Sequence, residues 1–480
     1  MGPLGQAFGG WEPSVWPGQL APSLAWSWFE EGWPTSASVR WPAALAAVLA
    51  GLILSRRVAE VLGDRAGVLA GLCWFGCLGL MDRSAGGGLD LMTGLFVVAA
   101  FDRLLGRGSD LVAGLFTALA FLTGGWPPAA LILLGTVVLG QRGATLSWRL
   151  LVPPCLAAVG WSAWILKVAP AEAWGTAVAL PLTQPLNVWL APGVLALGLP
   201  WSPFVVLAAS RSVREGWAPA GRSYATGWLQ VTGVCLIAGT LVPGLATAAR
   251  VPSLAGLAVV AAACLDRFLN AEAPVGFVRR WATGAVVAMV LAWAVLCVFG
   301  GGYLAAAVPY YRALSVLLIA GTGPLLVLAA RSAWRSDVRG ALLAALVLAA
   351  FLKITHYGYY VPEWNYRCSQ GPWGRAVGQW VPPRWPVYTT HAWPADLAFA
   401  TEHPFRQLAS ERHLEYQPGL VKFVLLLRSE FEHWPEQAPK LIQVAEFQDE
   451  YGQTRVLART EGDLPWVVAA KARGYDSDVE

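Results

Sequence analysis

The amino-acid sequence predicts an α-helical polytopic membrane protein with a C-terminal α/β domain. Its 480 residues are 56% hydrophobic and only 13% charged, whereas soluble domains carry about 25% charged residues. Apolar runs of helical length recur along the chain, broken by charged or Gly/Pro turns. Residues 362–480 hold 28 of the 64 charged side chains, which is typical of a soluble domain. This composition excludes a cytosolic enzyme and a disordered chain, and the net charge of +4 is too small to indicate nucleic acid as a partner.

The sequence divides into three expected parts. Residues 1–37 are rich in Trp, which favours the membrane interface, and 20–29 can form an amphipathic helix at the outer face. Residues 38–361 form the transmembrane bundle, and 362–480 form the extracytoplasmic α/β domain. We expect about twelve spans, at 41–60, 66–81, 90–106, 110–123, 127–141, 149–168, 187–210, 226–244, 253–269, 281–300, 313–331 and 340–360.

Basic residues in the connecting loops predict the orientation of these spans. Cytoplasmic loops carry an excess of Lys and Arg. One side of the predicted bundle carries Arg56, Arg57, Arg65, Arg103, Arg107, Arg142, Arg149, Arg211, Arg214, Arg222, Arg267, Arg279, Arg280, Arg331, Arg335 and Arg339. The other side carries only Arg40, Arg83, Lys167, Arg250 and Arg312. The second side is therefore predicted to face outward from the plasma (inner) membrane, and with twelve spans the C-terminal domain lies outside as well.

The C-terminal domain shows an α/β pattern. The segments 386–390 (PVYTT) and 420–427 (LVKFVLLL) resemble strands, and 395–401 resembles a short helix. Residues 441–447 and 454–460 flank Asp449–Gly452, which is the signature of a β-hairpin.

Ionisable residues on the outer side are the candidates for chemistry, because charges at a membrane are costly to retain. Asp90 opens a predicted helix, whose N-terminus would stabilise its carboxylate; either a plain helix cap or an outward-facing catalytic carboxylate explains it. Arg250 lies between two predicted spans. It is either an interfacial side chain or a clamp for a phosphate group.

Glu12, Arg83 and Lys167 complete the predicted outer set, with Glu12 as a further carboxylate and the two cations as lesser phosphate ligands. The five His residues are scattered without the spacing of metal ligands, and no Walker or Rossmann motif occurs. We therefore predict no His-rich metal site. Chemistry at the outer face, away from cytoplasmic nucleotides, requires a donor carried by a lipid.

Four stretches resemble the GT-C glycosyltransferases of the aminoarabinose-transferase and protein O-mannosyltransferase type. They occur in the family's order at 38–57, at the Met-Asp-Arg turn with Asp90, at 114–127 (GLFTALAFLTGGWP) and at 187–204, which contains LPWS. The resemblance implies a bundle of about thirteen helices with an outer α/β domain. It also implies transfer of a sugar from a polyprenyl-phosphate carrier to a lipid, glycan or protein acceptor at the outer face.

The same resemblance assigns roles to matched positions. Asp90 would be a site carboxylate, and Arg250 with Pro252 stands where the family has Ser-Lys-x-Pro-x-Tyr, so it would keep the phosphate-binding charge. Glu12 resembles the Glu before the family's Lys-Pro-Pro, and it could orient a Lys or bind a divalent cation.

Three departures keep alternatives open. Gly124 replaces the Lys of the family's TKGP motif, and Leu254 replaces the Tyr that follows the Ser-Lys motif. The family's principal catalytic Asp precedes the Glu that Glu12 matches, so on this alignment a first span and that Asp are expected upstream of residue 1. A non-catalytic protein that binds lipid-linked sugars is therefore the alternative. A transporter is a weaker one, because the spans show no internal repeat and few midplane polar residues.

Overall fold

The structure is a computed structural model. It describes residues 36–80, 90–106, 108–140, 147–168, 186–269, 276–363, 371–382, 385–390, 401, 403, 405–408, 414, 421–448 and 453–462. The described residues form two compact units, one over 36–359 and the other from 360 onward. The predicted interfacial segment 1–37 lies outside the described residues, except for its last two positions.

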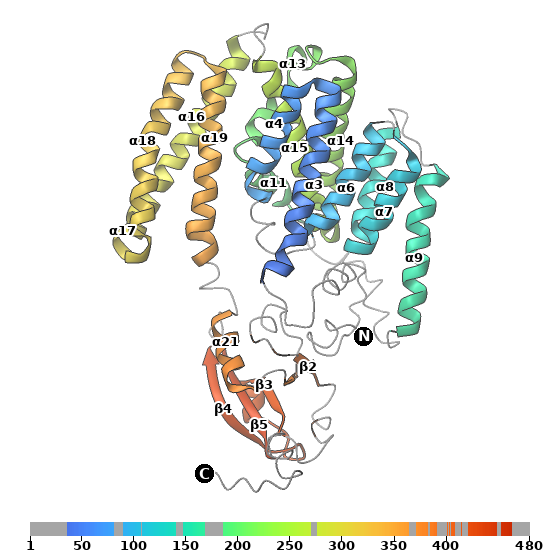
Figure 1. Cartoon of the computed structure of the whole chain (residues 1–480), viewed down its shortest axis with the longest axis vertical. Helices are drawn as coiled ribbons and strands as arrows, with labels where there is room; N and C mark the ends of the chain where they lie inside the picture. The colour runs from blue at the N-terminus through green and yellow to red at the C-terminus, as the bar shows by residue number, and fades with distance from the viewer. Residues whose placement is uncertain are drawn as a thin grey trace. The chain divides into compact units, whose positions relative to one another are not determined.

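The first unit is a bundle of helices (Figure 1). They are α3 (Ser36–Leu62), α4 (Asp64–Gly76), α6 (Asp90–Leu105), α7 (Asp110–Gly124), α8 (Trp126–Leu139), α9 (Trp148–Val168), α11 (Leu190–Leu197), α12 (Ser202–Val205), α13 (Arg211–Glu215), α14 (Pro219–Leu241), α15 (Ala246–Leu269), α16 (Gly276–Leu296), α17 (Gly302–Ala307), α18 (Arg312–Trp334) and α19 (Val338–Thr355). Each range predicted as a span contains helix, although several boundaries differ.

Two of the boundary differences have physical causes. The predicted span 187–210 is not one straight helix, because α11 and the helical segment 202–209 meet at 110°. Pro200 follows Leu199 there, and a proline disfavours helical backbone at the residue before it. The prediction that Arg250 lies in a loop is also wrong. Helix α15 begins at Ala246 and continues through Pro252, as membrane helices do when their neighbours pack closely around a proline.

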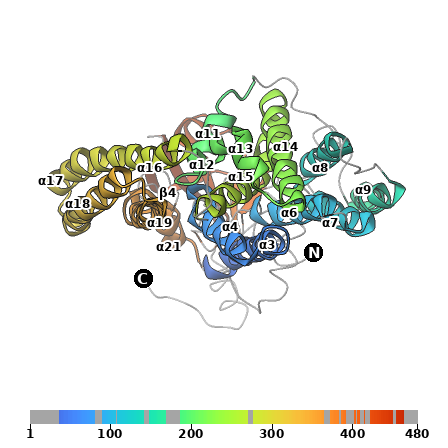
Figure 2. The same cartoon turned by 90° about the horizontal axis from the view of Figure 1, so that it is seen from above.

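Helix α15 forms the centre of the bundle, with 89% of its most apolar window buried. It packs against α14, α4, α6 and α12, and the view from above shows it among them (Figure 2). Its middle is rich in Ala and Gly, and such small residues allow helix backbones to approach closely. At Gly256, for example, a Cβ atom would overlap the Thr232 side chain.

Helices α16, α18 and α19 have a different environment. Only 28–33% of their most apolar windows is buried, and their exposed side chains are mainly aliphatic. Among the described residues, four helices are long and apolar enough to cross a membrane, or up to five if the bent pair counts as one span. Several others, such as α4 with 13 residues, are shorter than the roughly 20 residues of a straight span. The exposed apolar helices indicate an integral membrane protein.

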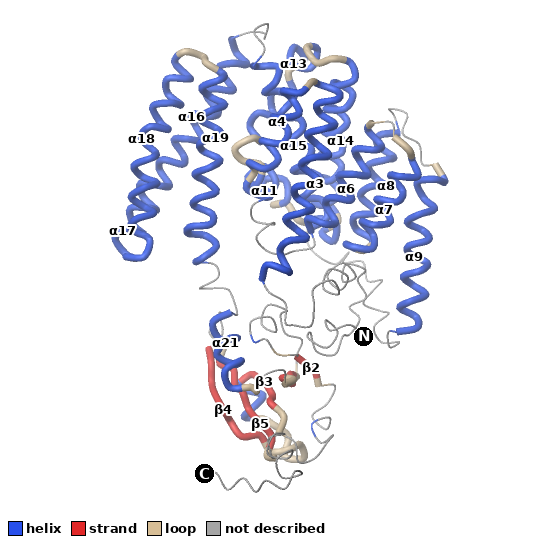
Figure 3. The backbone as a smooth tube through the Cα atoms, viewed as in Figure 1, coloured by secondary structure: helices blue, strands red, loops and turns tan. Residues whose placement is uncertain are grey.

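The second unit contains a five-stranded sheet (Figure 3). Its strands are β1 (Val387–Thr389), β2 (Phe405–Gln407), β3 (Phe423–Leu427), β4 (Leu441–Gln448) and β5 (Thr454–Thr460), in the order β2-β1-β3-β5-β4. Strand β1 runs parallel to β2 and β3, whereas β5 is antiparallel to β3 and β4. The predicted strands and the hairpin of β4 and β5 are present. The predicted helix 395–401 lies outside the described residues apart from Thr401.

The sheet buries apolar side chains on both faces, which explains the continuous run FVLLL of β3. Phe423 and Leu425 pack with Val377 of α21 (Gly371–Trp380), and Val424 and Leu426 pack on the opposite face. Helix α23 (Arg428–Glu432) follows β3 directly. The fold of this unit is therefore α/β, as predicted.

Candidate functional site

Asp90 is the first residue of α6 and is half-buried. The unpaired backbone N–H groups of a helix N-terminus carry a partial positive charge, which stabilises a carboxylate in the first turn. The carboxylate of Asp90 thus lies beside the partial positive charge of the first turn of α6. We call the end of the bundle at which α6 begins the Asp90 end.

Arg250 lies at the same end of the bundle as Asp90. Helices α6 and α15 approach so closely that a Cβ atom at Gly94 would overlap the side chain of Val251. Asp90 is one helical turn before Gly94, about 6 Å along the axis, and Arg250 directly precedes Val251. The contact of Gly94 with Val251 thus places Asp90 and the half-buried Arg250 near the first turns of two adjacent helices.

The turn between α7 and α8 closes against the start of α6. Thr93 and Thr123 are both buried, and their Oγ1 atoms lie 3.2 Å apart in a hydrogen bond. A Cβ atom at Gly124 would overlap Thr93, and Gly125 adopts φ = 77°, a left-handed conformation that glycine accommodates. Gly124, which replaces the lysine of the family motif, therefore supplies close packing and no charge.

The bend between α11 and α12 packs at this end too. The amide of Leu78 donates to the carbonyl of Leu199 over 3.3 Å, and a Cβ atom at Gly79 would overlap Leu254 and Leu197. The bend that contains LPWS thus packs close to Leu254 of α15, which lies one helical turn after Arg250. Leu254, which replaces the family's tyrosine, is 4% exposed and serves as core packing.

The remaining predicted site residues are placed less closely. Lys167 is in the last turn of α9, a helix that packs on α7 at the periphery of the bundle (Figure 2). Two helices thus separate its backbone from α15. Glu12 and Arg83 lie outside the described residues. No group of three or more His, Cys, Asp or Glu side chains that could hold a metal occurs in the described part of the chain.

A second charged cluster occupies the opposite end of α6, which we call the Asp102 end. Asp102 is 6% exposed and accepts a hydrogen bond of 2.9 Å from the Tyr224 hydroxyl. Arg57 lies 3.9 Å from Asp102, donates to Glu60 over 2.6 Å, and donates to the carbonyl of Gly106 over 2.7 Å. Our sequence reasoning missed this cluster because it considered only the outer side. The sequence feature that could have indicated this cluster is Asp102, an acidic residue within the predicted span 90–106.

Comparison with known proteins bears on the fold. No family model and no curated protein matches the sequence. Among solved structures, ArnT from Cupriavidus metallidurans bound to undecaprenyl phosphate has a TM-score of 0.62 at 17% identity, over 91% of this chain and 86% of ArnT. Apo ArnT from the same organism gives 0.62 at 16% identity, over 92% and 87%. The chain has the fold of ArnT.

The likeness to ArnT agrees with the GT-C resemblance of the four sequence stretches. It covers both the helical unit and most of the remaining chain, so the combination of an apolar bundle with a C-terminal sheet is shared. At 16–17% identity the likeness shows that the chain shares the fold of ArnT. The ArnT-like fold and the apolar helices together indicate an integral membrane protein.

Proposed function

We propose that this chain is a membrane glycosyltransferase that transfers a hexose or pentose from a polyprenyl-phosphate-linked donor to a lipid, glycan or protein acceptor at the outer face. The observation that carries the proposal is the ArnT fold over 91% of the chain, from a structure in which ArnT is bound to undecaprenyl phosphate. The positions of Asp90 and Arg250 at one end of the same helix pair add support.

Asp90 is the proposed general base. Its carboxylate takes a proton from the acceptor nucleophile, which attacks the anomeric carbon of the sugar. The bond from that carbon to the phosphate oxygen then breaks, and both electrons leave with the polyprenyl phosphate. Asp90 is the first residue of α6, where the partial positive charge of the helix N-terminus faces it.

Arg250 is the proposed ligand of the departing phosphate. A guanidinium binds phosphate oxygens in bidentate fashion and stabilises the negative charge that develops on the leaving group. Lys167 and Arg83 are proposed as secondary phosphate ligands, and Glu12 as an additional carboxylate that orients a cation.

One observation favours the alternative of a non-catalytic protein that binds lipid-linked sugars. Gly124 packs against Thr93 in place of the family's lysine, so that charge is missing from the turn. In this alternative the protein would bind polyprenyl phosphate without transferring sugar.

Turnover from a labelled donor tests the proposal. Membranes that contain the full-length chain are incubated with polyprenyl-phosphate-linked sugars labelled in the sugar, in the presence of the envelope acceptors. We expect label in the lipid, glycan or protein fraction together with release of polyprenyl phosphate. Donor binding without release of the lipid phosphate would support the non-catalytic alternative.

Arg250→Gln provides the matching variant. We expect a loss of transfer of about 100-fold, as is typical when a charge-stabilising donor is removed. Arg312→Gln is the control, because Arg312 is an exposed arginine on the same predicted side whose Nε donates to the Ala305 carbonyl. Equal activity of the two variants would remove Arg250 from the proposed site.

A further inference from the structure

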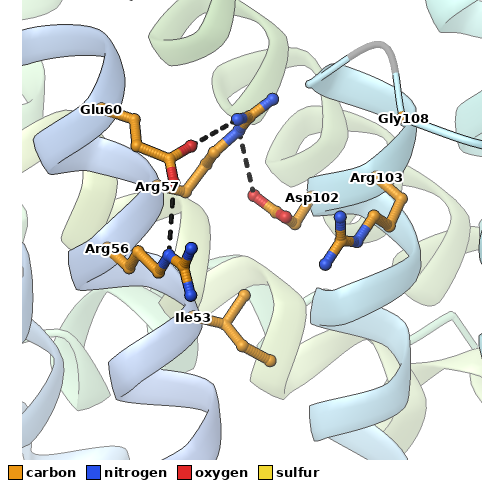
Figure 4. A pocket seen from close by; sticks show the side chains of 7 residues that line it. All are labelled: Ile53, Arg56, Arg57, Glu60, Asp102, Arg103 and Gly108. Carbon is orange, nitrogen blue, oxygen red and sulfur yellow. Dashed lines mark hydrogen bonds and ion pairs between the residues drawn. The ribbon is translucent and has the colours of Figure 1, made fainter.

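A small cavity at the Asp102 end lies between the end of α3 and the end of α6. It has a volume of about 220 Å³ and is lined by Ile53, Arg56, Arg57, Glu60, Asp102, Arg103 and Gly108 (Figure 4). Pockets for drug-sized ligands measure about 300–1,000 Å³, so this cavity has room for a small charged group rather than for a whole cofactor. It lies about 18 Å along α6 from Asp90, at the opposite end of the bundle.

Three arginines and two carboxylates line the cavity, so the lining carries a net positive charge. Both carboxylates are engaged within the protein, because Glu60 accepts from Arg57 and Arg56, and Asp102 accepts from Tyr224. Arg57 is engaged as well, with Glu60 on one side and the Gly106 carbonyl on the other. The part of the lining that remains for a ligand is therefore cationic.

Arg56 and Arg103 supply that cationic surface. Arg56 uses only its Nε in its contact with Glu60, at 3.3 Å, and Arg103 forms no ion pair or hydrogen bond through its side chain with the described residues. Figure 4 shows the two guanidinium groups reaching from opposite helices toward the space beside Ile53. Both arginines line the same cavity, and a guanidinium binds phosphate oxygens in bidentate fashion.

The surroundings indicate that this phosphate belongs to a lipid. Exposed apolar side chains follow one face of α3 at helical spacing and lead to Arg56: Leu45, Val48, Leu49 and Leu52, each 41–58% exposed. Ile53 extends the apolar surface into the cavity. Basic pockets between membrane helices on the cytoplasmic side are suited to anionic lipid head groups, and the arginine count predicts that this end is cytoplasmic.

We propose that the cavity is a binding site for the phosphate head group of an anionic phospholipid of the inner leaflet. The phosphate lies between Arg56 and Arg103, and an acyl chain runs along the exposed face of α3. Arg57, Glu60 and Asp102 are positioning residues that hold the two helix ends together. This site is separate from the proposed transfer site and does not depend on it.

Lipid retention by the purified full-length protein tests the proposal. Phosphatidylglycerol and phosphatidylcholine with the same acyl chains are each added to delipidated protein, and bound lipid is counted by native mass spectrometry. We expect phosphatidylglycerol to be retained and phosphatidylcholine to be lost. Inorganic phosphate and glycerol 3-phosphate form a third arm, and if they displace phosphatidylglycerol at equal concentration the site binds a soluble anion and the lipid assignment is wrong.

The double variant Arg56→Gln/Arg103→Gln should bind phosphatidylglycerol about tenfold more weakly, because each charge-assisted hydrogen bond contributes strongly to binding. The control is Arg331→Gln, which removes an exposed arginine near the end of α18, on the same predicted side but outside the cavity. The single variant Arg103→Gln, which removes no hydrogen bond or ion pair within the described part, provides the same test if the double variant does not fold. Unchanged retention in the folded variants would overturn the proposal. Since no turnover is measured, such a failure would leave the proposed transfer reaction untouched.

Discussion

Helix α6 carries a carboxylate near each end, and the two are stabilised in opposite ways. Asp90 stands at the N-terminus, where the helix dipole favours a negative charge. Asp102 stands near the C-terminus, where the dipole opposes a negative charge, and it is almost fully buried. The protein compensates Asp102 with the Tyr224 hydroxyl and the Arg57 guanidinium.

The two acids of α6 thus differ in their surroundings: Asp102 belongs to a network of three helices, whereas Asp90 is the first residue of the helix. Asp102 is tied into contacts between α3, α6 and α14, so its charge serves the packing of three helices. Asp90 begins α6 at the end where we propose the transfer site. We therefore expect substitutions at the Asp102 end to change stability, and substitution of Asp90 to change activity.

The largest effect on stability is expected for Asp102→Ala. The substitution leaves the buried Tyr224 hydroxyl without its acceptor and removes the attraction between Asp102 and Arg57, which still keeps Glu60, and together these losses cost about 3 kcal/mol. The thermal unfolding midpoint of the purified protein in detergent should fall by several degrees. Tyr224→Phe, which removes only a hydrogen bond, should cost about 1 kcal/mol. A midpoint that Asp102→Ala leaves unchanged would break the comparison.

Gly94→Ala should have an intermediate effect. The added methyl group overlaps Val251, and overpacking of this kind costs about 2 kcal/mol. Because the overlap pushes α6 away from α15, sugar transfer should fall together with the unfolding midpoint. The double variant Gly94→Ala/Val251→Ala should recover much of both losses. Gly160→Ala serves as control, since a Cβ atom there meets nothing within 4 Å. Failure of Val251→Ala to rescue would contradict the proposed contact.

The smallest effect is expected for Thr93→Val. This change removes the buried hydrogen bond to Thr123 while it keeps the shape of the side chain, at a cost of about 1 kcal/mol. Thr93→Ser, which retains the hydroxyl, is the control. A fall in the unfolding midpoint with Thr93→Val but not with Thr93→Ser would show that the polar contact, rather than the volume, fixes the α7–α8 turn on α6.

Each predicted span range contains helix because apolar runs of helical length favour helices, but only four helices of the described part, or up to five, are long and apolar enough to cross a membrane. The prediction failed at the bend near Pro200, and it began the helix of Arg250 too late, at 253 rather than at Ala246, because tertiary packing decides whether a membrane helix continues through a proline. Strand β2 went unpredicted because its residues Phe-Arg-Gln lack the β-branched residues that made the equally short β1 recognisable. These residues become a strand through their parallel pairing with β1, which the local sequence does not show.

The candidate site was predicted only in part. Asp90 and Arg250 could be selected because few charges occur on the predicted outer side. Their location at one end of a helix pair could not, because it depends on the approach of Gly94 to Val251. The Asp102 network depends on three helices that are far apart in the sequence. It therefore becomes visible only in three dimensions.

Transfer of labelled sugar from a polyprenyl-phosphate donor by Asp90→Asn protein tests the central claim most directly. The amide keeps the shape of the side chain but cannot accept a proton, so transfer should fall about 100-fold or more, whereas the unfolding midpoint should stay within a degree or two of the unsubstituted chain. Full transfer by the folded Asp90→Asn protein would remove Asp90 from the mechanism and contradict the distinction between the two ends of α6.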